Sequence, residues 1–309
     1  MQAILFCKIR TTDKHIYFFY NSTALYEYYI IVSIRWHGTQ CYKYPQGRTL
    51  TMKNHFSLKY FTTAVLLSSV LWSVEIKGDA EAVNIAGKQR MFTQRLLKDY
   101  AMIGMGNTFG DPKKDLTETA AAFEDHLASL KSYAKDAEIL KSIDESETLW
   151  KPIKNTLLKA PDIKEAGKLQ EDLEALLKAS DKTTKLFARA SGKNSGKIID
   201  IAGRQRMLSQ RMASLYMLKV WGIKDPQFKN KLNNAMELFN TSLETLEKSK
   251  MNTEEINALL SKTKRSFIFF EMMNRSKSKF IPTLIYKKSD DMLKNMNSAT
   301  QLYTHISSK

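Results

Sequence analysis

Apolar residues recur at helical spacing from about Asp79 to the end of the chain, and this pattern predicts a protein built almost entirely of helices. This part of the chain is rich in Ala, Leu, Lys, Glu, Ser and Met, and it contains few signals for strands. Two breaks in the pattern, around Pro112 and Pro226, place an Asp directly before a Pro. Such a pair predicts an N-cap followed by the first residue of a helix.

A twelve-residue motif occurs twice, as IAGKQRMFTQRL from Ile85 to Leu96 and as IAGRQRMLSQRM from Ile201 to Met212. The two copies are identical at eight of their first eleven positions. The motif glycines are 116 residues apart, and the same offset relates TKLF at 184–187 to TQLY at 300–303. The repeated unit is therefore much longer than the motif, and the sequence predicts two related modules.

Each module has room for four helices with short connections, which predicts an all-α fold of two tandem antiparallel four-helix bundles, preceded by a signal-peptide helix. We expect the first bundle at residues 79–190 and the second at residues 196–309. The helices that carry the motif are expected at about 79–105 and 196–222. The third helix of each module should begin near Ala137 or Thr253, and the fourth should end near Ala190 or Ile306.

The linker SGKNSG at 191–196 decides how the bundles meet. In an up-and-down bundle the fourth helix ends where the first began, so a short linker makes the two motif helices start close together and run parallel. The alternative is one long helix through the linker, with the bundles stacked end to end. Gly192 and Gly196 oppose it, because each costs about 1 kcal/mol inside a helix.

Residues 1–51 differ from the rest, because they are rich in Tyr, Ile and Phe, contain both cysteines and have no sustained helical period. The segment 52–73 that follows, MKNHFSLKYFTTAVLLSSVLWS, has the basic start, short apolar core and small residues of a secretory signal. We expect translation to begin at Met52, residues 1–51 to lie outside the fold as an over-extended start, and the exported protein to be periplasmic and free of cysteine. The signal is either cleaved or kept as an anchor.

The chain has 48 Lys and Arg against 32 Asp and Glu, which gives a formal net charge of +16. This charge indicates either an anionic partner or a basic surface without one. The charge alone does not choose between nucleic acid, a membrane surface and small anions, but a nucleic-acid partner does not fit an export signal, so we expect no nucleic acid.

The motif divides into two faces when it is wound as a helix of about 100° per residue. In the first copy Ile85, Phe92 and Leu96 fall within about 20° of one another, so they face the core of the module. The residues of the opposite face are Gly87, Arg90 and Gln94 in the first copy and Gly203, Arg206 and Gln210 in the second.

A glycine on this outer face indicates close approach by another backbone or by a ligand. If the two motif helices pair through this face, Arg90 and Arg206 meet as like charges, which is unfavourable unless an anion lies between them. The planar guanidinium fork suits nitrate, nitrite or a carboxylate. Arg95 and Arg211 point elsewhere and are expected in salt bridges. In the alternative interpretation all four arginines form intramolecular ion pairs.

The motif resembles the signature of PilJ-type domains, the N-terminal sensory domains of type IV pili methyl-accepting chemotaxis transducers. It is similar also to the P-box helix of the nitrate/nitrite sensor kinases NarX and NarQ. The resemblance implies a periplasmic four-helix bundle whose motif helices meet, usually across a dimer, and bind nitrate through the arginine that precedes the methionine. That arginine is Arg90 or Arg206 here, and the motif glycine is Gly87 or Gly203.

We therefore expect a non-catalytic, sensor-type binding protein for a small inorganic oxyanion or carboxylate, with nitrate or nitrite as the first choice and no cofactor. Two motifs in one chain allow the site to form within a monomer, and a homodimer is the alternative. Because no second apolar span or signalling region follows in the sequence, a membrane receptor is the expected partner. The rival function is an adaptor that docks onto an envelope receptor or a pilus-linked chemosensory protein.

Signals for catalysis or metal binding are weak in the helical part. His126 and His305 do not form the Glu-x-x-His pairs of di-iron bundles, and zinc motifs and nucleophile elbows do not occur. We therefore expect no enzyme activity and no metal. The methionines are expected to fill the core rather than to bind a soft metal; they include Met102, Met105, Met207, Met212 and Met217.

Overall fold

The computed structural model describes residues 4–11, 14–21, 32–34, 74–192, 194–275 and 281–308. The chain divides into two compact units, Met1–Ser68 and Ser69–Lys309. In the first unit, three strands form an antiparallel sheet in the order β1-β2-β3; they are β1 (Ile4–Thr11), β2 (Lys14–Asn21) and β3 (Val32–Ile34). Whether translation begins at Met52 stays a prediction, and the predicted signal peptide at 52–73 lies outside the described residues.

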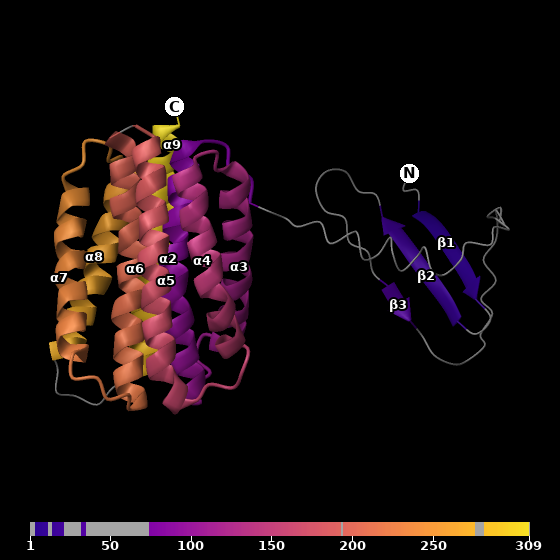
Figure 1. Ribbon diagram of the computed structural model, residues 1–309, viewed down its shortest axis with the longest axis horizontal. Coiled ribbons are helices and arrows are strands. Elements are labelled where there is room, and N and C mark those ends of the chain that lie inside the picture. The colour runs from indigo at the N-terminus through magenta and orange to yellow at the C-terminus, as the bar shows by residue number, and fades with distance from the viewer. Residues whose placement is uncertain are drawn as a thin grey trace. The chain divides into compact units, whose positions relative to one another are not determined.

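In the second unit, all the regular secondary structure among the described residues is helical, which confirms the predicted all-α class for this part of the chain (Figure 1). Its helices are α2 (Asp79–Gly104), α3 (Pro112–Tyr133), α4 (Ala137–Leu157), α5 (Ile163–Ala190), α6 (Asn194–Trp221), α7 (Phe228–Glu247), α8 (Glu254–Arg275) and α9 (Pro282–Ser307).

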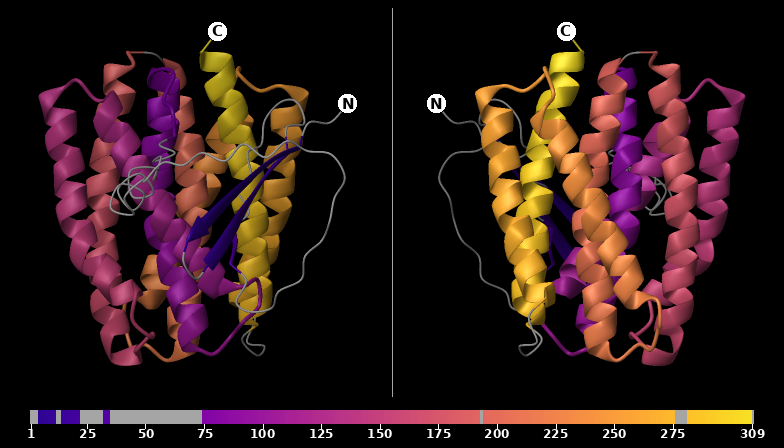
Figure 2. Two further views of the ribbon diagram at one scale, coloured as in Figure 1. Left: turned by 90° about the vertical axis from the view of Figure 1, so that its right-hand side faces the viewer. Right: turned by 90° about the vertical axis from the view of Figure 1, so that its left-hand side faces the viewer.

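The helices form two sets of four, α2–α5 and α6–α9, which lie side by side (Figure 1). Figure 2 shows the two sets from opposite sides, with the helices of both running along a common direction. The most extensive contact between any two helices joins α2 and α6, the helices that carry the motif. The repeated sequence therefore lies where the two sets meet.

The helix starts after the two Asp-Pro pairs differ. Asp111 caps α3 as predicted: its side chain accepts a hydrogen bond from the Lys114 backbone N–H, and Pro112 is the first helical residue. The predicted start of α7 at Pro226 is wrong, because α7 begins at Phe228. The Asp225 carboxylate and carbonyl accept from the N–H groups of Gln227 and Phe228, so this pair forms a turn before the helix.

The linker between the two sets breaks the helix, as predicted. The first set ends with α5 at Ala190, and α6 begins at Asn194, two residues earlier than expected. Gly192 has φ +61°, a left-handed conformation that glycine adopts without steric cost and that commonly ends a helix.

The motif helices run parallel, because their early and their late residues lie at matching levels. Gly87 and Gly203 lie against the same pair of guanidinium groups near the start of each helix. Near the end of α2, a Cβ added to Gly104 would come within 2.1 Å of the Trp221 ring of α6, so a glycine is required there. The Tyr100 and Trp221 rings meet edge to face at 5.9 Å.

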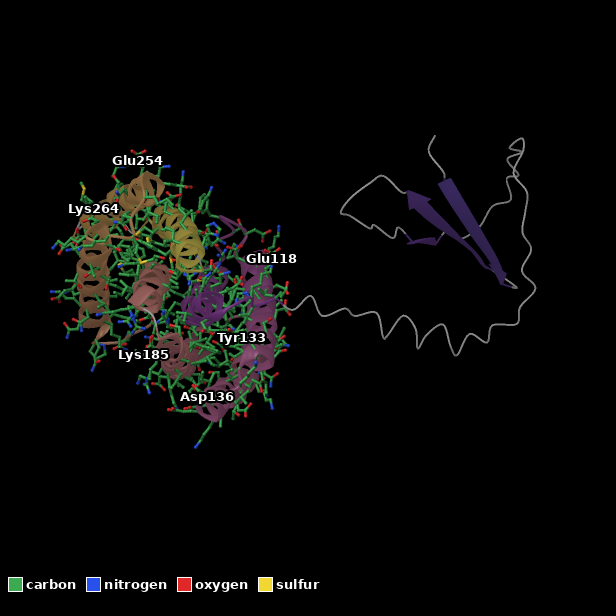
Figure 3. All side chains as sticks on the ribbon, turned by 90° about the horizontal axis from the view of Figure 1, so that it is seen from above. Glu118, Tyr133, Asp136, Lys185, Glu254 and Lys264 are labelled. Atoms are coloured by element: carbon green, nitrogen blue, oxygen red, sulfur yellow. The ribbon has the colours of Figure 1, made fainter. Side chains whose placement is uncertain are left out.

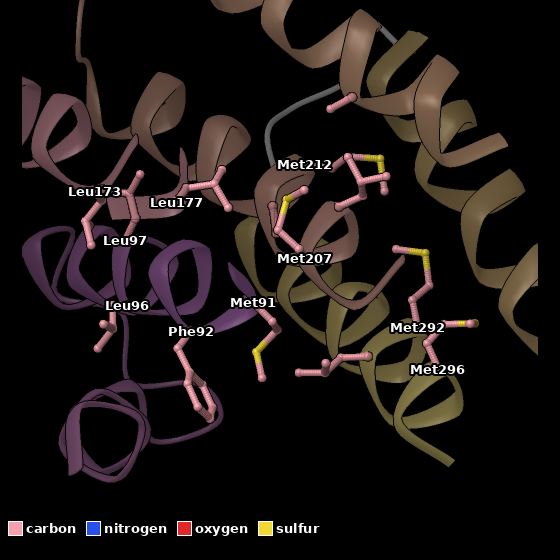
Figure 4. Close-up of a cluster of buried hydrophobic side chains, with 14 of the residues drawn as sticks. Met91, Phe92, Leu96, Leu97, Leu173, Leu177, Met207, Met212, Met292 and Met296 are labelled. Carbon is pink, nitrogen blue, oxygen red and sulfur yellow. The ribbon is translucent and has the colours of Figure 1, made fainter. Parts of the chain in front are cut away.

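Methionines fill much of the core. Figure 4 shows Met207 and Met212 from α6 close to Met292 and Met296 from α9, and all four are buried. Unbranched, polarisable side chains fill irregular gaps well, which agrees with their predicted role. The labelled charged residues Glu118, Asp136, Lys185 and Glu254 are exposed on the outside of the helical unit (Figure 3). None of the helices among the described residues combines the length and apolarity needed to cross a membrane.

Candidate functional site

The outward phase predicted for the motif is correct, and it brings Gly87 of α2 and Gly203 of α6 against one cluster. A Cβ built on Gly87 would lie 3.2 Å from Arg206 Nη2 and 3.4 Å from Arg90 Nη2. A Cβ built on Gly203 would lie 3.1 Å from Arg206 Nη2 and 3.3 Å from Arg90 Nη2. The glycines are therefore needed because they leave room for two guanidinium groups in the seam between the helices.

Arg90 is completely buried and is held by two carboxylates. Its Nη1 donates to Asp181 Oδ1 of α5 and to Asp200 Oδ1 of α6, both at 2.7 Å, and its Nη2 donates to the Asp200 carbonyl at 3.3 Å. Burial acts to raise the pKa of Asp181, but Arg90 and Lys185 outweigh it and hold that pKa below its ordinary value. Arg90 is thus a buried cation with its counter-ions supplied by the protein.

Arg206 is equally buried, but its partners are neutral. Its Nη1 donates to Asn84 Oδ1 of α2 at 2.8 Å and to Asn297 Oδ1 of α9 at 3.4 Å, and its Nη2 donates to the Asn84 carbonyl at 3.2 Å. No carboxylate lies within 4.0 Å of this guanidinium among the residues whose side chains the structure describes. Burial, and then the charge of Arg90, lower the pKa of Arg206 to about 9, so it remains charged at neutral pH.

Both arginines keep one side of the guanidinium group unused. The Nε atoms of Arg90 and Arg206 are buried and make no hydrogen bond. Each Nη2 carries two hydrogens, and one hydrogen bond is seen at each. Each guanidinium therefore has a spare pair of N–H groups on adjacent nitrogens, the arrangement that binds two oxygens of a planar oxyanion.

The two motif glutamines lie in the same seam but bind other groups. Gln94 Nε2 donates to Thr93 Oγ1 at 3.3 Å, and its Oε1 accepts from Ser214 Oγ of α6 at 3.3 Å. Gln210 Nε2 donates to the Ser289 carbonyl of α9 at 3.1 Å. The bonds to Ser214 and Ser289 connect neighbouring helices, and among the described contacts none joins either glutamine to the arginine pair.

The outer motif arginines form ion pairs, as predicted. Arg95 Nη2 lies 2.7 Å from Asp115 Oδ2, and Arg211 Nη1 lies 2.6 Å from Glu174 Oε1. The alternative that all four arginines are paired with acids is wrong for Arg206 within the described part of the chain. Among the four, Arg206 alone has only amide and carbonyl oxygens as partners there.

The sequence interpretation missed the four residues that hold the two arginines. They form two pairs related by the repeat offset of 116 residues, Asn84 with Asp200 and Asp181 with Asn297. Applying the offset to the polar residues next to the motif would have found Asn84 and Asp200, but not Asp181 and Asn297, which lie 91 residues from their arginines.

A cleft of about 520 Å³ opens beside the Arg206 side of the seam. Its lining includes Asn84 and Lys88 of α2 and Gln301 and His305 of α9. Burial, and then the charge of Arg206, lower the pKa of Lys88 to about 8, although Glu81 opposes the shift. The cleft therefore reaches the Asn84 amide that Arg206 binds. Its lining also includes a second cation, Lys88.

His126, which lies within reach of the charge of Arg206, is not suited to carry a charge itself. Burial, and then the charges of Lys88 and Arg206, lower the pKa of His126 to about 3. Its ring packs against Phe92 with 5.1 Å between centroids. Among the described residues, no three His, Cys, Asp or Glu side chains come together as they would around a metal ion.

The fold defines a helical domain in which two copies of one four-helix unit meet along their motif helices and enclose two arginines. The family model for the type IV pili methyl-accepting chemotaxis transducer N-terminal domain, PilJ, matches residues 71–182 and 187–262, and the chain belongs to this family. The first match covers α2 to most of α5, and the second begins near the end of α5 and continues into α8. No curated protein and no solved structure matches the chain significantly.

Membership of this family gives the coarse function. PilJ domains are sensory domains of chemotaxis transducers, located in the periplasm and typically without catalytic activity.

Proposed function

We propose that this chain is a sensor-type binding domain for a small oxyanion, nitrate or nitrite first, held between the motif helices α2 and α6. The observation that carries the proposal is the spare N–H pair on each of two fully buried guanidinium groups. Buried N–H groups are nearly always satisfied in native proteins, so groups that lack a protein partner are available to a ligand or to ordered water. The sensory role of the family supports the proposal.

The size and shape of the ligand follow from the glycines. Both Nη2 atoms lie within 3.4 Å of the positions where the two missing Cβ atoms would stand, so the guanidinium groups fill the room that the glycines leave, and an ion bound beside them must be small and flat. Nitrate, nitrite and formate present oxygens in one plane, as the guanidinium fork requires. A bulky ligand would have to separate α2 from α6.

We further propose that the site forms within one chain, in the periplasm. The motifs of a single chain already supply both arginines, so a dimer is not needed to complete the cluster. An exported protein fits the predicted leader at Met52 and the location of the family. A membrane receptor is the proposed partner. The adaptor function has no support comparable with the match to sensory domains.

The test is calorimetric titration of the purified chain with nitrate, nitrite, formate and acetate. Each charge-assisted hydrogen bond contributes roughly 1.5–3 kcal/mol, and desolvation of the anion and two guanidiniums offsets part of the sum. A net of roughly 5–8 kcal/mol corresponds to dissociation constants from about micromolar to somewhat below millimolar.

Arg206→Ala should remove most of this binding, because a lone guanidinium cannot clamp the ion from both sides. Arg211→Ala is the matched control, since Arg211 lies on the same helix and pairs with Glu174 instead. Binding in the control should match that of the parent. If no anion gives heat at millimolar concentration, or if Arg206→Ala binds as well as the parent, the proposed function fails.

A further inference from the structure

The arginine pair has two halves, which are Arg90 with its partners and Arg206 with its partners. The repeat relates the two halves, but they carry different charges. Position for position, Asp181 of the first module corresponds to Asn297 of the second, and Asp200 corresponds to Asn84. The bonds obey the same symmetry, because each arginine binds one residue from its own module and one from the motif helix of the other module. Both carboxylates therefore bind Arg90, and both amides bind Arg206.

The Arg90 half is electrically satisfied. Asp181 and Asp200 each lie 2.7 Å from Arg90 Nη1. The same carboxylates also bind Lys185 at 2.6 Å and Arg204 at 3.2 Å, which makes an alternating cluster of charges. An added anion would meet two fixed carboxylates here, and like charges at such short range repel strongly in a buried site.

The Arg206 half has an excess of positive charge. An amide oxygen accepts a hydrogen bond from a guanidinium but leaves its charge in place. Lys88, which corresponds to Arg204 in the repeat, interacts repulsively with Arg206 and has no ion-pair partner among the described side chains. Two cations and two amides therefore face one another beside the cleft that Asn84 and Lys88 line.

We infer that the two halves have different roles: one anion binds per chain, on the Arg206 side, and enters through the cleft past Lys88. The inference rests on the proposed function. Asp181 and Asp200 act as built-in counter-ions that already neutralise Arg90, although they bind its Nη1 and leave its Nε–H unused. If the two arginines had identical partners, the anion could bind equally well to either one. Here the two amides in place of two acids favour binding at Arg206.

The experiment exchanges the charges between the halves. Asn297→Asp gives Arg206 the carboxylate that Arg90 has, and Asp181→Asn gives Arg90 the amide that Arg206 has; both changes conserve shape. By calorimetry, the parent should bind one nitrate per chain, Asn297→Asp should bind at least tenfold more weakly, and Asp181→Asn should bind at least as tightly as the parent. Lys88→Met should slow association of nitrate and weaken binding severalfold.

A second readout does not depend on choosing the right anion. Without added anion, Asn297→Asp should raise Tm, because it supplies a counter-ion to a buried unpaired cation, whereas Asp181→Asn should lower Tm. Circular dichroism of each variant checks that the helices are retained.

The outcomes separate the two proposals. If the parent binds no oxyanion, the proposed function fails, and this inference falls with it. If the parent binds nitrate but Asn297→Asp binds equally well, or Asp181→Asn loses as much affinity as Asn297→Asp, the exchange of acids for amides does not decide where the anion binds, and the inference alone is overturned. A stoichiometry of two, or a lower Tm for Asn297→Asp, would overturn it as well.

Discussion

At the scale of single residues, two chemically identical arginines differ through their partners. Arg90 and Arg206 are both fully buried, yet one is neutralised by two carboxylates and the other is surrounded by amides. Burying a charge is costly unless it is paired, and breaking a buried pair costs more than omitting it. The same substitution at the two positions should therefore have different effects on stability.

Arg90→Met should destabilise the ligand-free protein by about 3 kcal/mol, the lower end for a broken buried pair, because Asp181 and Asp200 retain some exposure. Arg206→Met should change the free energy of unfolding by no more than about 1 kcal/mol, because the loss of its hydrogen bonds is offset by removal of an unpaired buried charge. Urea unfolding of both variants without oxyanion measures the difference. Equal losses would show that the two sites are electrostatically equivalent.

At the scale of helices, the seam between α2 and α6 depends on residues without side chains. A Cβ at Gly203 would contact the arginine pair. A Cβ at Gly167, near the start of α5, would meet open space. A larger side chain at the first position must push the guanidiniums or the helix aside. At the second position it meets solvent.

Gly203→Leu should therefore weaken nitrate binding by more than about tenfold, since displacement by a leucine costs at least about 1.4 kcal/mol. Gly167→Leu, the control, should leave binding unchanged and raise stability by up to about 1 kcal/mol, because leucine is the better helix former. Titration calorimetry and urea unfolding of both variants give the two quantities. Retention of full affinity by Gly203→Leu would place the ligand elsewhere.

The helices and the outward face of the motif could be predicted because both follow from local periodicity. The phase of Arg90 and Gly87 is fixed by helix geometry alone, so the seam was predictable once the repeat was found. Asp181 was not, because it lies 91 residues from Arg90 and meets it only through the packing of α5 against α2. The start of α7 was missed for a local reason, since an Asp-Pro pair can form a turn as well as an N-cap.

At the scale of the whole helical unit, the two modules have kept the same framework and diverged in buried charge. A second ionic cluster occurs in the first module, where Lys98 and Asp99 are both fully buried. The corresponding residues of the second module are Ser214 and Leu215. Lys98 Nζ lies 2.7 Å from Asp290 Oδ1 of α9 and 3.7 Å from the centre of the Tyr286 ring, so this cluster joins the two modules.

Within this cluster Asp99 lacks hydrogen bonds. Neither carboxyl oxygen has a hydrogen-bond partner, and the nearest cationic nitrogens, on Lys98 and Arg95, are 3.8 Å away. Burial raises the pKa of Asp99 to about 7; Lys98 and Arg95 act in the opposite direction, while Asp115 and Asp290 add to the rise. With Asp99 protonated, two cations face two remaining carboxylates, and the cluster is balanced.

The pH dependence follows from the sign of this shift. The folded state holds the Asp99 proton up to about pH 7, whereas the unfolded chain releases it near pH 3.8. The folded protein therefore binds more protons between these values, and the contribution of Asp99 to stability falls as pH rises through this window. Above pH 7 the full cost of a buried carboxylate remains.

Asp99→Leu, which copies the residue at the equivalent position 215, should remove this cost. The gain in free energy of unfolding over the parent should be smallest near pH 4 and increase by up to about 4 kcal/mol by pH 8, at about 1.36 kcal/mol per unit of pKa shift. Urea unfolding of parent and variant at four or five pH values measures the curve. Because Asp115 stays paired with Arg95 in both proteins, its own acid titration cancels in the difference. A gain that does not vary with pH would mean that Asp99 titrates alike in the folded and unfolded chains, and that the two modules do not share a protonated carboxyl at their interface.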